Sequence, residues 1–394
     1  MKRTKSPMNT QDARSLQGDP VRRSKLAKKV GQTYGGERDV YAALGYTYSN
    51  QLTLQHYIQA YERQDIARKI NDAPVQATWR GDIKVTDSSE KGRSGFDAAW
   101  EDLSKRLRLW NKIARLDRLV GLGQYAVLVL GFDDVDNDNG FAQPVQENGN
   151  RKLLYVHPYH QMNAQVETWD NNPRSEGHGL PLTYKLYSTS SSNQSGRTYD
   201  IIVHHSRVIH VAENLLESEV YGYPRLKVVW NRLEDLMKIV GGSAEMFWRG
   251  ADPKYALNLD KEADLTDQEK EDVQTQLSEF EHNLRRWLRV QGMDGEHLSA
   301  QVYDPSNHVD VQISMIAAAA GIPKRLLIGS ERGELSSTQD ESNWNQKIQD
   351  RQETFAEQAI LRPFIDRLIN YGVLPVPEEE DYDVQWPDLW TPSL

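Results

Sequence analysis

Apolar side chains in the first half of the chain follow helical and then strand-like patterns. They recur every three or four residues from Leu52 to Ile70 and from Phe96 to Val120, which predicts two helices. Asp72-Ala-Pro74 is expected to end the first helix, because a residue before proline is pushed out of the helical region. Apolar runs separated by polar loops then predict one small mixed sheet with strands at Tyr125–Leu130, Lys152–His157, Thr183–Tyr187, Ile201–Val203 and Val208–Val211.

The second half has mostly helical patterns. A helix is predicted from about Arg225 to Trp248, and its Gly241-Gly242 pair marks a bend or a close contact with another helix. The next helix starts at the capping-box pattern Thr266-x-x-Glu269. Strand candidates flank this helix, so a β-α-β insertion is expected; they are Tyr255–Leu259 and His297–Tyr303.

Three more segments follow towards the C-terminus. The small-residue run Val309–Ala320 predicts a helix that Gly321-Ile-Pro323 stops. The glycine-bearing loop Ile328–Ser337 leads to a polar helix from about Thr338 to Tyr371, which Pro363 is expected to kink because proline lacks an amide donor. From Val373 the chain is expected to be extended and acidic.

Length and charge limit the possible classes of function. The 394 residues suffice for two or three domains, and the lack of cysteine excludes disulfides, thiolate metal sites and a cysteine nucleophile. No apolar stretch approaches the roughly 20 residues of a membrane-spanning helix, and no secretory signal pattern is present. Residues 1–30 carry nine Lys or Arg and two Asp, so a flexible basic tail is expected over residues 1–36. The net charge of the chain is −10, and residues 1–30 contribute +7, so the remaining residues carry −17. A body this acidic disfavours broad nucleic-acid binding.

The short motifs that would carry chemistry are incomplete. Gly121-x-Gly123-x-x-Ala126 fits a dinucleotide-binding string, but it follows a helix and precedes a strand, which is the reverse of the required order. No phosphate-binding loop of the NTPase kind occurs, which excludes a motor ATPase. Asp134-x-Asp136-x-Asp138 resembles the start of a calcium loop, but its later positions do not fit. We therefore expect no catalytic residue, no metal and no cofactor.

Histidines provide the enzymatic alternative. His204, His205 and His210 could bind a metal, but strand alternation is expected to place His204 and His205 on opposite faces. Two His-x-Ser strings on predicted strands, beginning at His204 and at His297, are the minimum for a two-histidine phosphodiesterase. That enzyme, using His204 and His297, remains an alternative.

Several segments occur in a recognisable order over residues 37–394. They are the helix Leu52–Ile70, the strand YAVLVLGF, the strand-like HHSRVIHVAE, Tyr221-Gly-Tyr-Pro-Arg-Leu226 opening a helix that ends in Phe247-Trp-Arg-Gly, Gly321-Ile-Pro-Lys-Arg-Leu-Leu-Ile-Gly-Ser330, Glu334–Asn343 and Asp383–Trp390. No single string is diagnostic. As an ordered set, they resemble the portal proteins of tailed bacteriophages.

The resemblance implies an α+β portal fold with a mixed α/β wing, a helical stem, a small α/β clip and a long kinked helix. Because the chain stops at Leu394, a short or absent crown is expected. Carried onto this sequence, the parts are the basic tail 1–36, wing 37–222, first stem helix 223–250, clip 251–308, second stem helix 309–322, tunnel-loop region 323–340, long kinked helix 341–372, and an extended segment 373–394 that returns to the wing.

The implied function is structural. A ring of about twelve copies would occupy one capsid vertex of the virion, after assembly in the host cytoplasm, and conduct double-stranded DNA without reading its sequence. Twelve copies at −10 would sum to about −120, and an acidic wall disfavours adhesion of phosphates. The implied partners are the terminase large subunit, head–tail adaptor or neck proteins, and major capsid and scaffolding proteins, with no membrane. Another structural head-completion protein is the second alternative.

The resemblance also assigns residues to three surfaces. The tunnel loop near DNA would comprise Gly329, Ser330, Glu331, Arg332, Gly333, Glu334 and Leu335. Packing between stem helices in the ring would use the small residues Gly241, Gly242, Ala317, Ala318, Ala319 and Ala320. Docking of partners at the clip would use Glu269, Glu271, Arg285, Arg286 and Trp287.

Overall fold

The chain folds into two units in the computed structural model. One unit comprises Met1–Glu234 and Ser314–Leu394, and the other comprises Asp235–Ile313. The structure describes residues 44–48, 51–88, 93–147, 149–188, 199–250, 254–259, 266, 268, 271–272, 275–276, 278, 293–298, 304–329, 337–378 and 380–390.

Two pairs of helices open the first unit, where the sequence predicted two single helices. They are α4 (Leu54–Arg63), α5 (Asp65–Thr78), α6 (Gly95–Leu107) and α7 (Leu109–Leu122). The extended backbone of Gln64 separates the first pair, and Arg108, in the left-handed conformation with φ 49°, separates the second. Pro74 lies inside α5, so the expected helix end at Asp72-Ala-Pro74 was wrong. The last turn of α5 is held by buried Val75 and Thr78, whose packing outweighs the local cost of proline.

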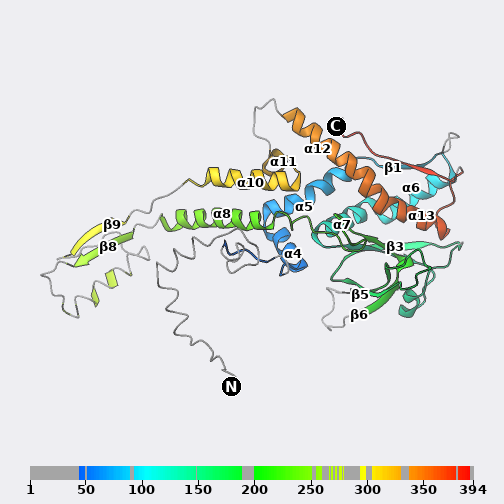
Figure 1. The fold of residues 1–394 in the computed structure, drawn as a ribbon, viewed down its shortest axis with the longest axis horizontal. Coiled ribbons are helices and arrows are strands. Elements are labelled where there is room, and N and C mark those ends of the chain that lie inside the picture. The colour runs from blue at the N-terminus through cyan, green and yellow to red at the C-terminus, as the bar shows by residue number, and fades with distance from the viewer. Residues whose placement is uncertain are drawn as a thin grey trace, which may run out of the picture. The chain divides into compact units, whose positions relative to one another are not determined.

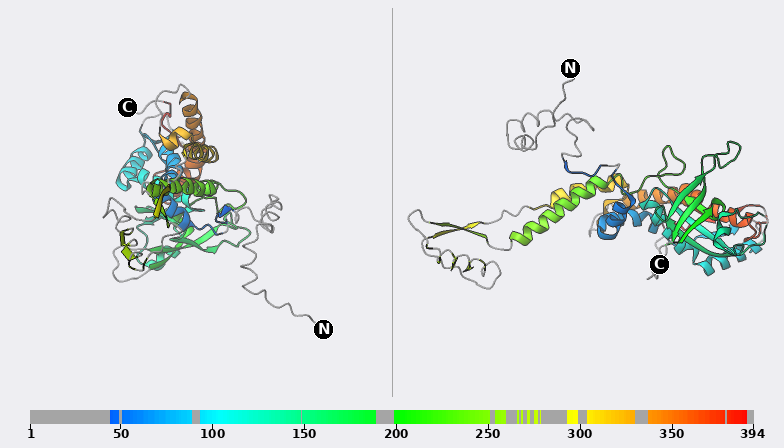
Figure 2. Two further views of the ribbon diagram at one scale, coloured as in Figure 1. Left: turned by 90° about the vertical axis from the view of Figure 1, so that its left-hand side faces the viewer. Right: turned by 90° about the horizontal axis from the view of Figure 1, so that it is seen from below.

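Six strands form two antiparallel sheets of three strands each, which corrects the expected single mixed sheet. The first sheet has the order β3-β2-β7, and the second has the order β4-β5-β6. The short 3₁₀ turn η2 (His205–Arg207) carries the chain from one sheet to the other. The strands are β2 (Ala126–Phe132), β3 (Leu153–His160), β4 (Ala164–Trp169), β5 (Pro181–Ser188), β6 (Tyr199–His204) and β7 (Val208–Val211). The right-hand view of Figure 2 shows these green strands in front of the orange and red helical run.

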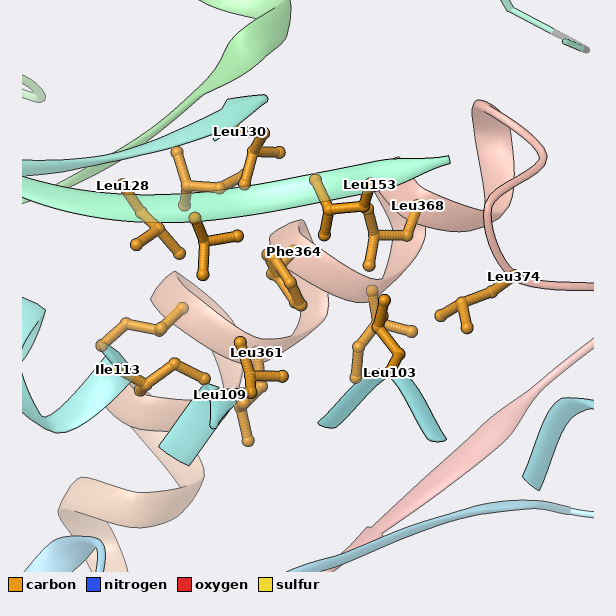
Figure 3. Packing of buried hydrophobic residues seen from close by; sticks show 14 of the residues in the cluster. Leu103, Leu109, Ile113, Leu128, Leu130, Leu153, Leu361, Phe364, Leu368 and Leu374 are labelled. Atoms are coloured by element: carbon orange, nitrogen blue, oxygen red, sulfur yellow. The ribbon is translucent and has the colours of Figure 1, made fainter. Parts of the chain in front are cut away.

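Strand β2 lies at the centre of the first unit because both of its faces are apolar and buried. Leu128 and Leu130 pack against helix residues such as Ile113 and Phe364, as Figure 3 shows. Tyr125, just before β2, and the alternate β2 residues Val127 and Val129 belong to a second cluster, which the β4-β5-β6 sheet covers. The unit therefore has helices, one sheet and a second sheet stacked as layers.

The C-terminal part of the first unit is a long helical run (Figure 1). It consists of α12 (Ser337–Arg351), the π-helix η3 (Gln352–Leu361) and α13 (Arg362–Asn370), and it is preceded by α10 (Ser306–Ala320) and α11 (Lys324–Ile328). Pro363 is the second residue of α13 and does not interrupt the run. The irregularity is the π-helix before it, where the Arg362 amide donates to the Glu357 carbonyl.

Two short strands at distant points of the chain form a separate ladder. β1 (Lys84–Asp87) pairs antiparallel with β10 (Tyr382–Gln385), with Val85 opposite Val384. The extended C-terminal segment is thereby held against the first unit. The polar segment between β2 and β3 is a loop, as predicted, apart from the 3₁₀ turn η1 (Asp138–Ala142). The predicted loop at 188–197 lies almost wholly outside the described residues.

The second unit continues α8 (Trp230–Gly250), which begins five residues later than predicted because residues 225–229 form turns. Strands β8 (Lys254–Leu259) and β9 (Met293–Leu298) pair antiparallel. β9 starts four residues before the predicted strand His297–Tyr303. Helical residues lie between the two strands, as the predicted β-α-β order requires; they are Gln268, Glu271, Asp272, Thr275, Gln276 and Ser278.

Candidate functional site

Helix α8 carries an apolar face that is exposed in the described part of the chain. Leu233 and Leu236, near the start of the helix, are buried. Further along, Met237, Val240 and Trp248 are exposed, the indole to 81%. Together with Gly241 and Ala244, these residues lie three or four positions apart and so share one side of the helix. An apolar stripe of this kind indicates a surface that binds another protein.

Gly241 and Gly242 lie within α8, which passes through them without a break. A Cβ atom added at either glycine would meet nothing within 4 Å. The predicted close contact is therefore absent within the described part of this chain. Both residues remain candidates for packing against a second copy.

Helix α10 has a comparable exposed face. Val311 and Met315 are exposed, and Ala318 and Ala319 continue the same side of the helix. Of the other predicted packing residues, Ala317 is buried and Ala320 is half-buried. Gly321, at φ +62°, ends the helix as predicted.

A buried ionic cluster of four side chains lies in the first unit. Asp117 of α7 accepts hydrogen bonds from Arg351 of α12 at 2.6 and 3.0 Å and from Arg225 at 2.8 Å. Glu213, which follows β7, accepts from Arg225 Nε at 2.7 Å and from Arg351 Nε at 3.0 Å. Trp79 Nε1 also donates to Asp117, at 2.7 Å. Two carboxylates and two guanidiniums thus neutralise one another.

The charges in the cluster depend on one another. Burial alone would raise the pKa of Asp117, but Arg351 and Arg225 outweigh it and lower the pKa to about 2. Burial lowers the pKa of Arg351, but Asp117 and Glu213 outweigh it, so the net shift is upward. Asp117 and Arg351 are therefore both charged near neutral pH, and removing either would leave a buried charge without its partner.

Two contacts extend the cluster. Lys347, one turn before Arg351 on α12, donates from Nζ to the carbonyls of Ala320 and Gly321 at 3.0 Å each. A lysine at this place satisfies acceptors at the C-terminal end of α10. A Cβ atom at Gly121 would lie 2.3 Å from Asn71 Oδ1 and 2.6 Å from Arg225 Nη1. The first glycine of the dinucleotide-like string is thus a site of close helix packing.

The predicted tunnel loop is described only at its two ends. Gly329 is exposed at φ +90°, a conformation that favours glycine. Helix α11 and the first residues of α12 lie inside the predicted tunnel-loop region 323–340, so that region is partly helical. Outside the described residues lie Ser330, Glu331, Arg332, Gly333, Glu334 and Leu335.

The predicted clip surface is mostly outside the described residues. Glu271 is exposed on a helical turn, where its carbonyl accepts a hydrogen bond from Thr275 Oγ1. The other four members are not described; they are Glu269, Arg285, Arg286 and Trp287.

The calcium-like loop is used for an ion pair. Asp134 accepts two hydrogen bonds of 2.8 Å from buried Arg207, and Arg151 lies 3.2 Å away. The hydrogen bonds from Arg207 lower the pKa of Asp134. Among the residues that the structure describes, no group of three or more His, Asp or Glu side chains is arranged to hold a metal ion.

The histidines are arranged differently from the prediction. The ring centroids of His204 and His205 lie 4.4 Å apart, so their expected placement on opposite faces was wrong. The reason is that β6 ends at His204 and η2 begins at His205. His204 Nδ1 is engaged locally, 2.9 Å from Ser206 Oγ. His297 lies in β9 of the other unit, where side chains are not described.

The ionic cluster was missed at the sequence level. A carboxylate at position 117 interrupts the otherwise apolar stripe of α7, between Ile113 and Val120. A buried carboxylate requires a partner, so this position could have indicated a buried ion pair. Nothing in the sequence selects Arg225 and Arg351 from the 47 Lys and Arg residues.

Several solved structures are similar to this chain. A chain from the neck of an empty gene transfer agent (GTA) particle has a TM-score of 0.52 at 15% identity, covering 90% of this chain and 87% of that one. A neck chain of the native GTA particle has a TM-score of 0.48 at 14% identity, over 74% and 75% of the two chains. An HK97 family phage portal protein from Corynebacterium diphtheriae has a TM-score of 0.40 at 8% identity, over 83% and 94%. The first likeness shows that the α+β fold is shared.

No curated protein matches the chain in sequence. No helix within the described ranges is long and apolar enough to cross a membrane. The family model described as phage portal protein matches residues 55–394, which is most of the chain. Because this match covers most of the chain, the chain belongs to the phage portal protein family.

Proposed function

We propose that this chain is a non-enzymatic portal subunit that forms a ring of about twelve copies at one capsid vertex. DNA would enter and leave the capsid through the ring. The observation that carries the proposal is the pair of exposed apolar faces on α8 and α10. In a head-to-tail ring each copy offers one face to each neighbour, so both faces become covered when the ring closes.

The charge of the chain supports passage of DNA. The net charge is −10, so a ring of about twelve copies carries a large negative charge. A negative wall disfavours lasting contact with phosphates, and the duplex slides with few strong contacts. The segment Gly329–Leu335 would approach the DNA as the tunnel loop. The terminase and the neck proteins would dock on the clip, residues 251–308.

Negative-stain microscopy of the purified full-length protein tests ring formation. Wild type is expected to form rings with a central hole. Val240→Asp places a charge on the exposed face of α8 and is expected to prevent rings while leaving the fold intact, as judged by circular dichroism. Val376→Asp is the matched control, because Val376 is also exposed but lies in the C-terminal segment. A wild-type protein that stays monomeric at high concentration, or normal rings from Val240→Asp, would contradict the proposal.

A deletion of residues 330–336 tests the role of the loop. The variant is expected to form rings and to lose packaging of DNA in a particle-assembly assay. If the variant formed rings that package DNA normally, the proposed role of the loop would be wrong, but the proposed contacts between subunits would stand.

A further inference from the structure

The four members of the ionic cluster come from four separate segments of the first unit. Asp117 belongs to α7, Glu213 follows β7, Arg225 precedes α8, and Arg351 is the last residue of α12. Arg351 alone makes four hydrogen bonds, because its Nη1 also donates to Thr78 Oγ1 at 2.7 Å. The end of α12 is therefore tied directly to α7, to the segment after β7 and to α5, and through the shared carboxylates to Arg225.

Apolar packing alone does not fix the direction of α12. Trp344 and Ile348 bury one side of the helix, but hydrophobic contacts are non-directional. An open pocket of about 520 Å³ is lined by Arg351 and Lys347, so this side of α12 is not fully covered by apolar packing. Paired hydrogen bonds between guanidinium and carboxylate groups constrain angle as well as distance, so the ionic cluster supplies the direction that packing leaves open.

Lys347 ties the same side of α12 to α10. It lies four residues before Arg351, so the two cations share one helix face. Its ammonium group holds the carbonyls of Ala320 and Gly321, where α10 ends. Arg225, on the other side of the cluster, lies five residues before α8 begins. Lys347 and Arg351 therefore link the end of α12 to the end of α10 and, through the shared carboxylates, to the segment that leads into α8.

Small rotations at this point have large effects at the other end of α12. The helix has 15 residues, which corresponds to roughly 22 Å at 1.5 Å per residue. A tilt of about 10° at Arg351 would move the opposite end, at Ser337, by roughly 4 Å over that length. Ser337 is the first described residue after the predicted tunnel loop.

We propose that the ionic cluster of Asp117, Glu213, Arg225 and Arg351, assisted by Lys347, is the joint that positions α12 and thereby the tunnel loop. These are positioning residues, since none belongs to the loop. The inference rests on the proposed function, because the position of the loop matters only if DNA passes it.

The alternative is that the cluster only stabilises the fold. A second ion pair in the same unit, whose arginine is buried, supplies the control. Asp134 accepts two hydrogen bonds from Arg207 and is also near Arg151, so it too has two arginine partners. This pair joins the β2–β3 loop to η2, and none of the hydrogen bonds and ion pairs described for it involves α12. Arg351→Met and Arg207→Met therefore each remove one of two arginines from a carboxylate, which is fully buried in Asp117 and half-buried in Asp134.

The experiment measures hydrogen exchange of the full-length protein, in assembled rings, at equal temperature intervals below each variant's Tm. Arg351→Met is expected to raise exchange in residues 339–347 by about tenfold relative to Arg207→Met, because local opening of α12 becomes easier. Lys347→Met is expected to raise exchange in residues 316–322 by a smaller factor. Packaging of DNA should fall in Arg351→Met and stay normal in Arg207→Met.

Two further variants cover the case in which Arg351→Met does not fold. Lys347→Met removes an exposed side chain and leaves the buried charges intact. Arg351→Lys keeps the charge but cannot reach both carboxylates and Thr78, so it should give intermediate exchange and packaging. The proposal would be overturned if the variants of residues 347 and 351 exchanged in α12 at the same rate as Arg207→Met and packaged DNA normally. Failure of the wild type to form rings would overturn the proposed function, while exchange in the unassembled subunit would still decide whether the cluster holds α12.

Discussion

Helices α13 and α8 use apolar residues in contrasting ways. Phe364, Ile365 and Leu368 of α13 are fully buried, covered by α7 and by the β3-β2-β7 sheet of the same chain. Beyond Leu236, α8 exposes Met237, Val240, Phe247 and Trp248. Both helices are amphipathic, but within the part of the chain that the structure describes the apolar face of α13 is covered and that of α8 beyond Leu236 is exposed.

The contrast separates stability of the fold from assembly. The first unit has a layered core, and its buried charges are paired within one chain. The exposed side chains of α8 gain little in a single copy, because their apolar area stays in water. Substitutions in the core should therefore lower the free energy of unfolding. Substitutions on the exposed face of α8 should weaken assembly of the ring.

Truncating an aromatic side chain in each helix tests the contrast most strongly. Phe364→Ala is expected to lower the free energy of unfolding by about 3–5 kcal/mol, because it leaves a cavity in a closed core. Trp248→Ala removes a larger side chain but should change the free energy of unfolding by less than about 0.5 kcal/mol. Urea denaturation of both variants at concentrations below assembly gives the two values. A loss above about 2 kcal/mol for Trp248→Ala would show that a single copy already covers α8.

The buried charge of the first unit predicts a dependence on acid. The pKa of Asp117 is about 2 in the folded protein and about 3.9 in an unfolded chain. The folded state therefore binds this proton less readily, so the stabilisation is present above pH 4 and is lost as the pH falls towards 2. The free energy of unfolding should fall by about 2 kcal/mol over that range on account of this group. In Asp117→Asn the free energy of unfolding should fall less steeply between pH 4 and pH 2, as measured by urea denaturation at each pH. The same pH dependence as in wild type would show that Asp117 is not the group responsible.

The same substitution at two helical glycines should have opposite effects. Gly121→Ala should destabilise the protein by about 1–3 kcal/mol, because the new Cβ would overlap Asn71 and Arg225. Gly241→Ala meets open space and should stabilise α8 by up to about 1 kcal/mol in the single copy. Thermal denaturation measures both. In assembled rings Gly241→Ala should weaken assembly if neighbouring helices approach there, so rings of wild-type stability would exclude Gly241 from the contact.

The sequence predicted the elements whose apolar pattern is strong. β2 is a continuous apolar run, and β7 was predicted with the bounds observed. α10 ends at Gly321, as predicted, because a glycine that adopts positive φ is a common signal for the end of a helix. The helix break at Arg108 could not be predicted, because an arginine in the left-handed region has no sequence signature. β4 was missed because the outer half of that strand is exposed and polar.

The candidate site was less predictable than the fold. Exposed apolar residues on α8 follow an ordinary helical period, so the sequence alone does not distinguish them from core residues. The ionic cluster joins residues as far apart as Asp117 and Arg351, and only the folded chain brings them together. The tunnel loop and clip surfaces remain predictions from family resemblance.

The pairing of β1 with β10 has a consequence for synthesis of the protein. Lys84 finds its partner at Gln385, and the core of the first unit needs Phe364 and Leu368 as well. At roughly 5–20 residues per second, a ribosome needs about 10 s to a minute to reach these positions after it has made β2. Throughout that interval the nascent chain holds an apolar sheet surface that α7 covers but α13 does not yet cover, so it should depend on chaperones until α13 and β10 have been made.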